Sequence, residues 1–147
     1  MIEMRLWPDS ARAGWPLLAI VVAGLVFAAA AHAQRSLPPV TRHIPRHAAA
    51  ILDGCTAAQR RMITIRIGAA IDIGAPAYND GDYLACYRTY ESTARAIEAA
   101  LPNACGGPGR ALRVGRATAA AATSDSARAW AMRDAFDGLL IVLTGGP

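Results

Sequence analysis

The sequence predicts an all-α fold of about four helices arranged as two antiparallel hairpins. Apolar residues recur at helical spacing through most of the chain after residue 56, whereas only one short stretch alternates like a strand. Connections rich in Gly, Pro, Asn and Asp separate the periodic segments, and short connections make successive helices antiparallel. With 147 residues, 54% of them hydrophobic, the chain suits one small domain and excludes an ordinary disordered polymer.

The first 33 residues have the layout of a secretory signal peptide. Residues 1–16 are polar, residues 17–31 form an unbroken apolar run, and Ala31-His32-Ala33 offers small residues at the cleavage positions. A retained anchor is the alternative, but a membrane span needs about 20 apolar residues and this run is shorter. We therefore expect cleavage after Ala33, a periplasmic or secreted protein, and no membrane span in the mature form.

Residues 34–55 are predicted to form an extended leader rich in Pro and Arg. Prolines alternate with basic residues between positions 34 and 47, a pattern that disfavours both a helix and a central strand. Leu37, Val40 and Ile44 are the apolar side chains that could lie along the folded body. The helical domain is then expected to comprise residues 56–147.

The first helix is expected to begin after Thr56, because Thr56 and Gln59 have the spacing of a capping box. Residues 63–67 alternate like a strand, but without a second strand to pair with, a helix is more consistent with the rest of the chain. Pro76 should kink or end this helix, and residues 79–81 close it. One face then carries Ile63, Ile67, Ala70, Ile71, Gly74 and Tyr78.

The second helix is the clearest element of the sequence. Asp82 is its expected N-cap, and Pro102 should stop it at about Ala100. Its apolar stripe comprises Tyr83, Cys86, Tyr87, Tyr90, Ala94, Ile97 and Leu101. The opposite, solvated face has charges spaced for ion pairs, namely Arg88, Glu91, Arg95 and Glu98.

Two more helices complete the predicted domain. Residues 103–109 are expected to form a loop, followed by an Ala-rich helix over residues 110–123 with Leu112 as its main apolar anchor. Ser124 and the residues after it should cap a fourth helix that runs to about Leu143. Its buried side is expected to comprise Trp130, Ala131, Phe136, Leu139, Leu140 and Leu143.

One hairpin of the chain resembles a known repeat. A small residue and an aromatic residue recur as in the second helix of a tetratricopeptide repeat, and the residues concerned are Gly81, Asp82, Tyr83, Cys86, Tyr90 and Thr93. The segment from Gly74 to Leu101 is also similar to part of bacterial exported helical proteins of unassigned function. The chain departs from the repeat in its longer second helix, in a closing proline displaced to Pro102, and in the absence of a 34-residue period. The resemblance implies a helical hairpin and carries no activity.

Three cysteines in an oxidising compartment allow one disulfide and one remaining thiol. In an antiparallel hairpin, Cys55 before the first helix and Cys105 after the second meet at the same end. Cys86 lies roughly 20 Å from that end at 1.5 Å per residue, beyond the roughly 7 Å that a disulfide allows between α-carbons. We therefore expect a Cys55–Cys105 bond and a buried Cys86. The alternative, Cys86–Cys105, requires the second helix to break early.

A basic stripe marks the start of the third predicted helix. Arg110, Arg113 and Arg116, here named the arginine stripe, recur every three residues beside Gly106-Gly107. Free N–H groups and guanidinium forks both suit an anion or an acidic partner. A solvated helix face is the simpler interpretation. Nucleic acid is not expected as a partner, because the aromatic residues lie on predicted buried stripes and the compartment is unsuitable.

Two short motifs could suggest a metal site, and neither is expected to form one. His43 and His47 are four residues apart, but Pro45 disfavours a helix between them and the neighbouring arginines repel a cation. Residues 79–82 offer the oxygen ligands of a calcium loop, yet the following sequence is already helical. A turn between helices, with Asp82 as cap, explains that motif.

Motifs of common enzymes are absent from the sequence. It contains no Gly-x-Ser-x-Gly, Cys-x-x-Cys, His-Glu-x-x-His or Gly-rich phosphate loop, and it implies no cofactor. Cys55 with His43 or His47 could form a nucleophile and base, which the predicted disulfide excludes. The sequence favours a non-enzymatic protein-interaction module of the bacterial cell envelope that binds another envelope protein. A periplasmic small-ligand or anion-binding protein using the arginine stripe is the alternative, and an unfamiliar envelope enzyme is a third interpretation.

Overall fold

A computed structural model of the chain describes residues 40–145, and within that range the fold is all-helical, as predicted. The predicted signal peptide and residues 34–39 of the leader lie outside the described residues. Four α-helices and two short 3₁₀ helices make up the described part: η1 (Ala49–Leu52), α2 (Ala57–Asn79), α3 (Tyr83–Ala100), η2 (Asn103–Cys105), α4 (Gly106–Ala121) and α5 (Asp125–Thr144).

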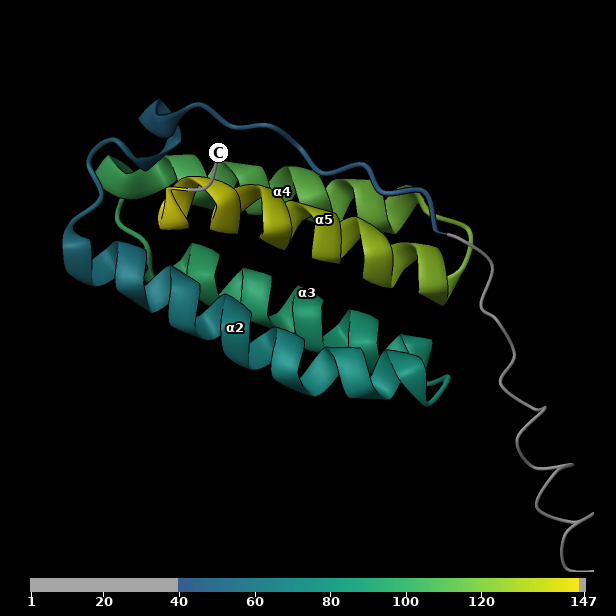
Figure 1. Ribbon diagram of the computed structural model, residues 1–147. Helices are drawn as coiled ribbons and strands as arrows, with labels where there is room; N and C mark the ends of the chain where they lie inside the picture. Colours follow the sequence, from purple (N-terminus) through teal and green to yellow (C-terminus); the bar gives the residue numbers. More distant parts are fainter. Residues whose placement is uncertain (1–39, 146–147) are drawn as a thin grey trace, which may run out of the picture. The chain divides into compact units, whose positions relative to one another are not determined.

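The helices form two hairpins that pack face to face. α2 lies against α3 and α4 lies against α5, and α3 contacts both helices of the second hairpin (Figure 1). The turns at residues 80–82 and 122–124 are so short that each hairpin is antiparallel. The core lies between the hairpins, and its largest fully buried side chains include Phe136, Ile63, Ile67, Ile97, Leu112, Met132 and Leu139.

Side-chain caps set the starts of three helices where the sequence predicts them. The Thr56 hydroxyl accepts the Gln59 backbone N–H at 3.2 Å, and the Gln59 side chain accepts the Thr56 N–H at 2.7 Å. Asp82 accepts the N–H of Ala85 at 3.0 Å. Ser124 likewise accepts the Ala127 N–H at 3.1 Å. Each cap satisfies an N–H group that the first helical turn leaves without a partner.

The prediction for the third helix is wrong at both ends. α4 begins at Gly106 rather than Arg110 and ends at Ala121 rather than residue 123, so the expected loop shrinks to η2. Pro108 is tolerated because it lies in the first turn, where its missing N–H would have no helical partner. Gly107 is also required here, since a Cβ at this position would collide with the carbonyl oxygen of Ile51.

From Thr41 onward, the chain before α2 belongs to the same compact unit as the helices. Residues 41–48, here named the strap, are extended and run along α4 and α5 (Figure 1). Gly138 of α5 makes room for the strap, because a Cβ there would lie 2.6 Å from the carbonyl oxygen of Pro45. The strap thus packs against the second hairpin and leaves α2 uncovered.

Candidate functional site

Cys55 and Cys105 form a disulfide in the structure, and Cys86 remains a buried free thiol. The α-carbons of the bonded pair are 4.5 Å apart, and 50 residues separate the two cysteines in sequence. The bond fastens the segment just before α2 to the start of α4, at the end of the hairpin where the sequence places it. Because Cys55 is consumed in this bond, it cannot act as the nucleophile of a Cys-His pair.

The arginine stripe is largely occupied by carboxylates of α3. The Arg116 guanidinium lies 3.0 Å from Glu98 and 4.0 Å from Glu91, and that of Arg113 lies 3.8 Å from Glu98. Arg110 is exposed and has no ion pair within residues 40–145. The stripe therefore presents one guanidinium free of a carboxylate, rather than three, to a dissolved anion.

The two motifs that could suggest a metal site have different structural roles. The backbone N–H of His43 donates to Asp134 at 2.6 Å, whereas His47, near the other end of the strap, is half-buried, and desolvation lowers its pKa. Asp82 caps α3, and Gly81 has a positive φ of 88° in the turn before it. In the described part of the chain, no cluster of three or more metal-ligating side chains occurs.

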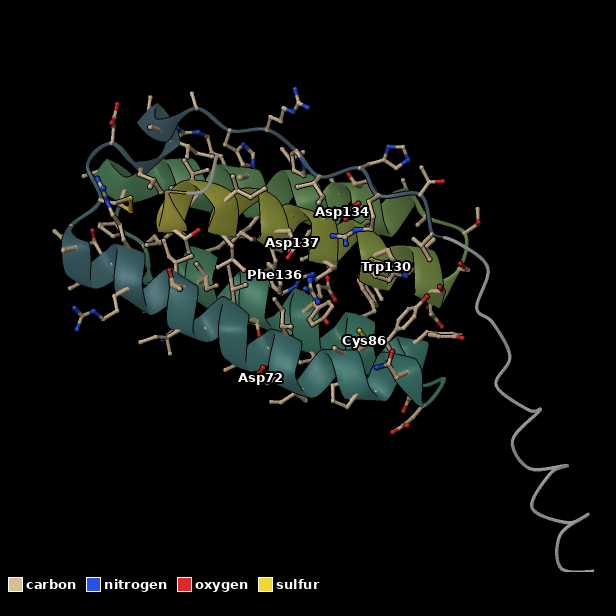
Figure 2. The ribbon with its side chains drawn as sticks, viewed as in Figure 1. Asp72, Cys86, Trp130, Asp134, Phe136 and Asp137 are labelled. Atoms are coloured by element: carbon tan, nitrogen blue, oxygen red, sulfur yellow. A yellow bond between two sulfur atoms is a disulfide. The ribbon has the colours of Figure 1, made fainter. Side chains whose placement is uncertain are left out.

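A charged cluster, missed by the sequence analysis, fastens the strap to α5. The Arg42 guanidinium lies 2.5 Å from both Asp134 and Asp137 and stacks 4.7 Å from the Trp130 ring centre. Arg133 pairs with the second oxygen of Asp137 at 2.9 Å. Figure 2 shows Asp134 and Asp137 on α5 beside the strap. Asp134 is buried, so the paired charges satisfy a carboxylate that would otherwise be costly to bury.

A line of hydrogen bonds continues from this cluster to α2. The Trp130 indole N–H donates to the Tyr78 hydroxyl at 2.8 Å, and the Tyr78 oxygen lies 2.7 Å from the Ser126 oxygen. Tyr78 also packs on Tyr83, with ring centres 4.6 Å apart. These contacts join the end of α2 to α5. Periodicity alone places Tyr78 and Trp130 on buried helix faces, and the contacts show that the two residues bind each other.

A small cavity lies beneath Trp130 and is lined mainly by apolar atoms. Its volume is about 70 Å³, and its wall includes Tyr78, Cys86, Tyr90, Trp130 and Arg133. Burial raises the pKa of the Cys86 thiol. The pKa of Tyr90 is raised to about 12, mainly by burial and to a smaller extent by the neighbouring Cys86. Both groups are therefore protonated at neutral pH, so the cavity offers neither a thiolate nucleophile nor a phenolate base.

The most unusual surface of the described chain is the outward side of α2. Ile65 and Ile73 are 61% and 63% exposed, although α2 buries a separate set of apolar residues against α3. Sequence analysis missed this surface, and its signal was the strand-like alternation at residues 63–67, which puts isoleucines on both sides of a helix. We name it the α2 outer face, and it comprises Ala58, Arg61, Ile65, Arg66, Ala69, Asp72, Ile73 and Pro76.

Comparison of the chain with protein-family models, with curated proteins and with solved structures finds no match. Among the helices at residues 40–145, none is both long enough and apolar enough to span a bilayer.

Proposed function

We propose that the chain is an exported, non-enzymatic protein-interaction module of the bacterial cell envelope and that it binds its partner through the α2 outer face. The observation that carries the proposal is the exposure of Ile65 and Ile73, eight residues apart on one side of a helix. A helix that is apolar on opposite sides has two surfaces to cover, and α3 covers only one of them.

Export is proposed from two features of the chain. The first 33 residues have the polar, apolar and small-residue regions of a cleaved signal peptide. The Cys55–Cys105 bond adds support, because disulfides persist in the periplasm or outside the cell and are rare in the cytosol. The mature protein would then begin with the extended leader that continues into the strap.

Site-specific photo-crosslinking in cells tests the proposed interaction. A photoreactive amino acid placed at position 73 should form covalent adducts with protein after irradiation. Position 114 provides the matched control, because Val114 is 67% exposed on α4 but is flanked by polar and small residues. Adducts at position 73 and few at position 114 are the expected result. Equal yields at both positions, or none at either, would contradict an interaction module that works through α2.

A further inference from the structure

We infer that the α2 outer face binds a second copy of this chain, as an antiparallel helix pair with its two-fold axis at Ala69. This inference rests on the proposed function and specifies the partner. Two helices related by a two-fold axis bring each residue opposite the one equally distant from the axis on the other copy. The α2 outer face is complementary to itself under that operation, in both its apolar and its charged residues.

The apolar residues match first. Ile65 and Ile73 lie four residues before and four after Ala69, so Ile65 of each copy faces Ile73 of the other. Ala69 faces its own copy, and a side chain of one methyl group lets the two helix axes approach closely at the crossing point. The pair thereby covers four isoleucine side chains that are otherwise more than half exposed.

The charges match under the same operation. Arg66 and Asp72 lie three residues before and three after Ala69, so each copy places Arg66 opposite Asp72 of the other, twice per pair. Both residues are exposed, and within residues 40–145 neither forms an ion pair. Arg66 and Asp72 are six positions apart on one helix and so cannot face each other within a copy.

The remaining charges near this surface do not oppose the pairing. The guanidinium of Arg66 donates one hydrogen bond to the Ala96 carbonyl at 3.0 Å, which holds the side chain at the edge of the face. Arg61 lies eight residues from Ala69, so the two Arg61 copies are roughly 24 Å apart along the pair. That separation exceeds the screening length of about 8 Å in physiological salt, and their repulsion is small.

Sedimentation measures the association directly. The protein, purified after expression of the full chain, is studied from about 1 µM to about 1 mM, a range that covers weak dimers. We expect a monomer–dimer equilibrium whose dissociation constant rises at least about tenfold in Ile65→Ser and changes less than about twofold in Val114→Ser.

Charge reversal tests the register of the pair. Arg66→Asp alone and Asp72→Arg alone each place like charges opposite each other and should weaken the dimer at least about fivefold. The double variant Arg66→Asp/Asp72→Arg restores opposite charges at both positions and should recover the original dissociation constant within about twofold. Recovery supports this antiparallel register, because general loss of helix stability would not be reversed by the second substitution.

The outcomes separate this inference from the proposed function. A monomer at every concentration, while position 73 still captures a different protein in cells, would overturn the self-association and leave the interaction module standing. A monomer together with no adducts at position 73 would overturn both. A dimer whose dissociation constant is unchanged by Ile65→Ser and by both charge reversals would also overturn the inference, because its interface would lie elsewhere.

Discussion

α2 and α3 are neighbours in one hairpin, yet their surfaces away from the core differ in kind. The exposed side of α3 carries short and charged residues, including Arg88, Ser92 and Arg95, and Arg95 pairs with Glu91 at 2.7 Å. The exposed side of α2 carries Ile65 and Ile73 instead. α3 also contacts three other helices, whereas α2 depends mainly on α3 and touches α5 less.

This difference teaches that folding of one chain completes α3 and leaves α2 half covered. Isoleucine at an exposed helix position adds nothing to helix propensity that alanine would not supply better. Two such residues on one side, centred on Ala69, are the reason that we propose association through this face. Substitutions can therefore show whether α2 is held in the monomer as firmly as α3 and whether its outer face contributes to association alone.

Loss of the disulfide should have the largest effect, because it ties the start of α2 to the end of the hairpin. In the chain-entropy account, closing a loop of 50 residues stabilises the fold by about 4 kcal/mol. The variant Cys55→Ser/Cys105→Ser should lose stability of that order in urea unfolding. Cys86→Ala, a buried thiol outside the bond, is the control and should lose about 1 kcal/mol. Equal losses would show that α2 is not held by this bond.

Truncating isoleucines on opposite sides of α2 should give unequal results. Ile67 is buried between α2 and the rest of the core, so Ile67→Ala should lower the free energy of unfolding by about 3 kcal/mol. Ile65→Ala should change it by less than about 0.5 kcal/mol when measured at a concentration where the protein is monomeric. A large loss for Ile65→Ala under those conditions would mean that this side chain supports the monomer.

Removing Arg42 should have a smaller effect, confined to the second hairpin and its strap. Arg42→Ala removes the guanidinium from Asp134 and Asp137, while Arg133 still pairs with Asp137 and the His43 N–H still donates to Asp134. Because a third of the Arg42 side chain is exposed, we expect a loss of about 1 kcal/mol. Hydrogen exchange should quicken at the backbone N–H of His43, which Asp134 holds, and stay unchanged in α2. Quickening throughout α2 would show that the strap supports both hairpins.

The smallest expected effect is a pH dependence at His47. Burial lowers the pKa of His47, so the folded chain binds a proton there more weakly than the unfolded chain does. The free energy of unfolding is then unaffected above the usual pKa of about 6.5 and falls as the pH drops below it. Urea midpoints at about pH 7.5 and about pH 5.5 should differ less in His47→Gln than in the unaltered protein. An identical difference in both would contradict this assignment.

The sequence predicts those features of the fold that depend on local chemistry. Thr56, Asp82 and Ser124 set helix starts through hydrogen bonds to residues three positions away. The disulfide is also predictable, because the topology of an antiparallel hairpin brings Cys55 and Cys105 to one end. Helix periodicity similarly identifies the buried stripe of α3, including Cys86.

Features that depend on distant residues are missed. Arg42 bonds to Asp134, which is 92 positions away in the sequence, and no local pattern predicts that contact. The start of α4 is not predicted because the Gly and Pro residues at 106–109 have low helix propensity and indicate a loop. Contact of Gly107 with the chain at Ile51 outweighs that low propensity. The α2 outer face escapes prediction because Ile63 and Ile67 already complete one buried side, and periodicity assigns no role to Ile65 and Ile73 on the other.

Disulfide trapping at the proposed two-fold axis tests the central claim most directly. In Ala69→Cys the new thiol should face its own copy, whereas in Val114→Cys it should point into solvent on α4. Under mild oxidation at a dilute, equal concentration, we expect a covalent dimer to form much faster from Ala69→Cys, and Ile65→Ser in the same chain to slow it. Equal rates from the two cysteine variants would contradict the claim that the outer surface of α2 is an interface between copies.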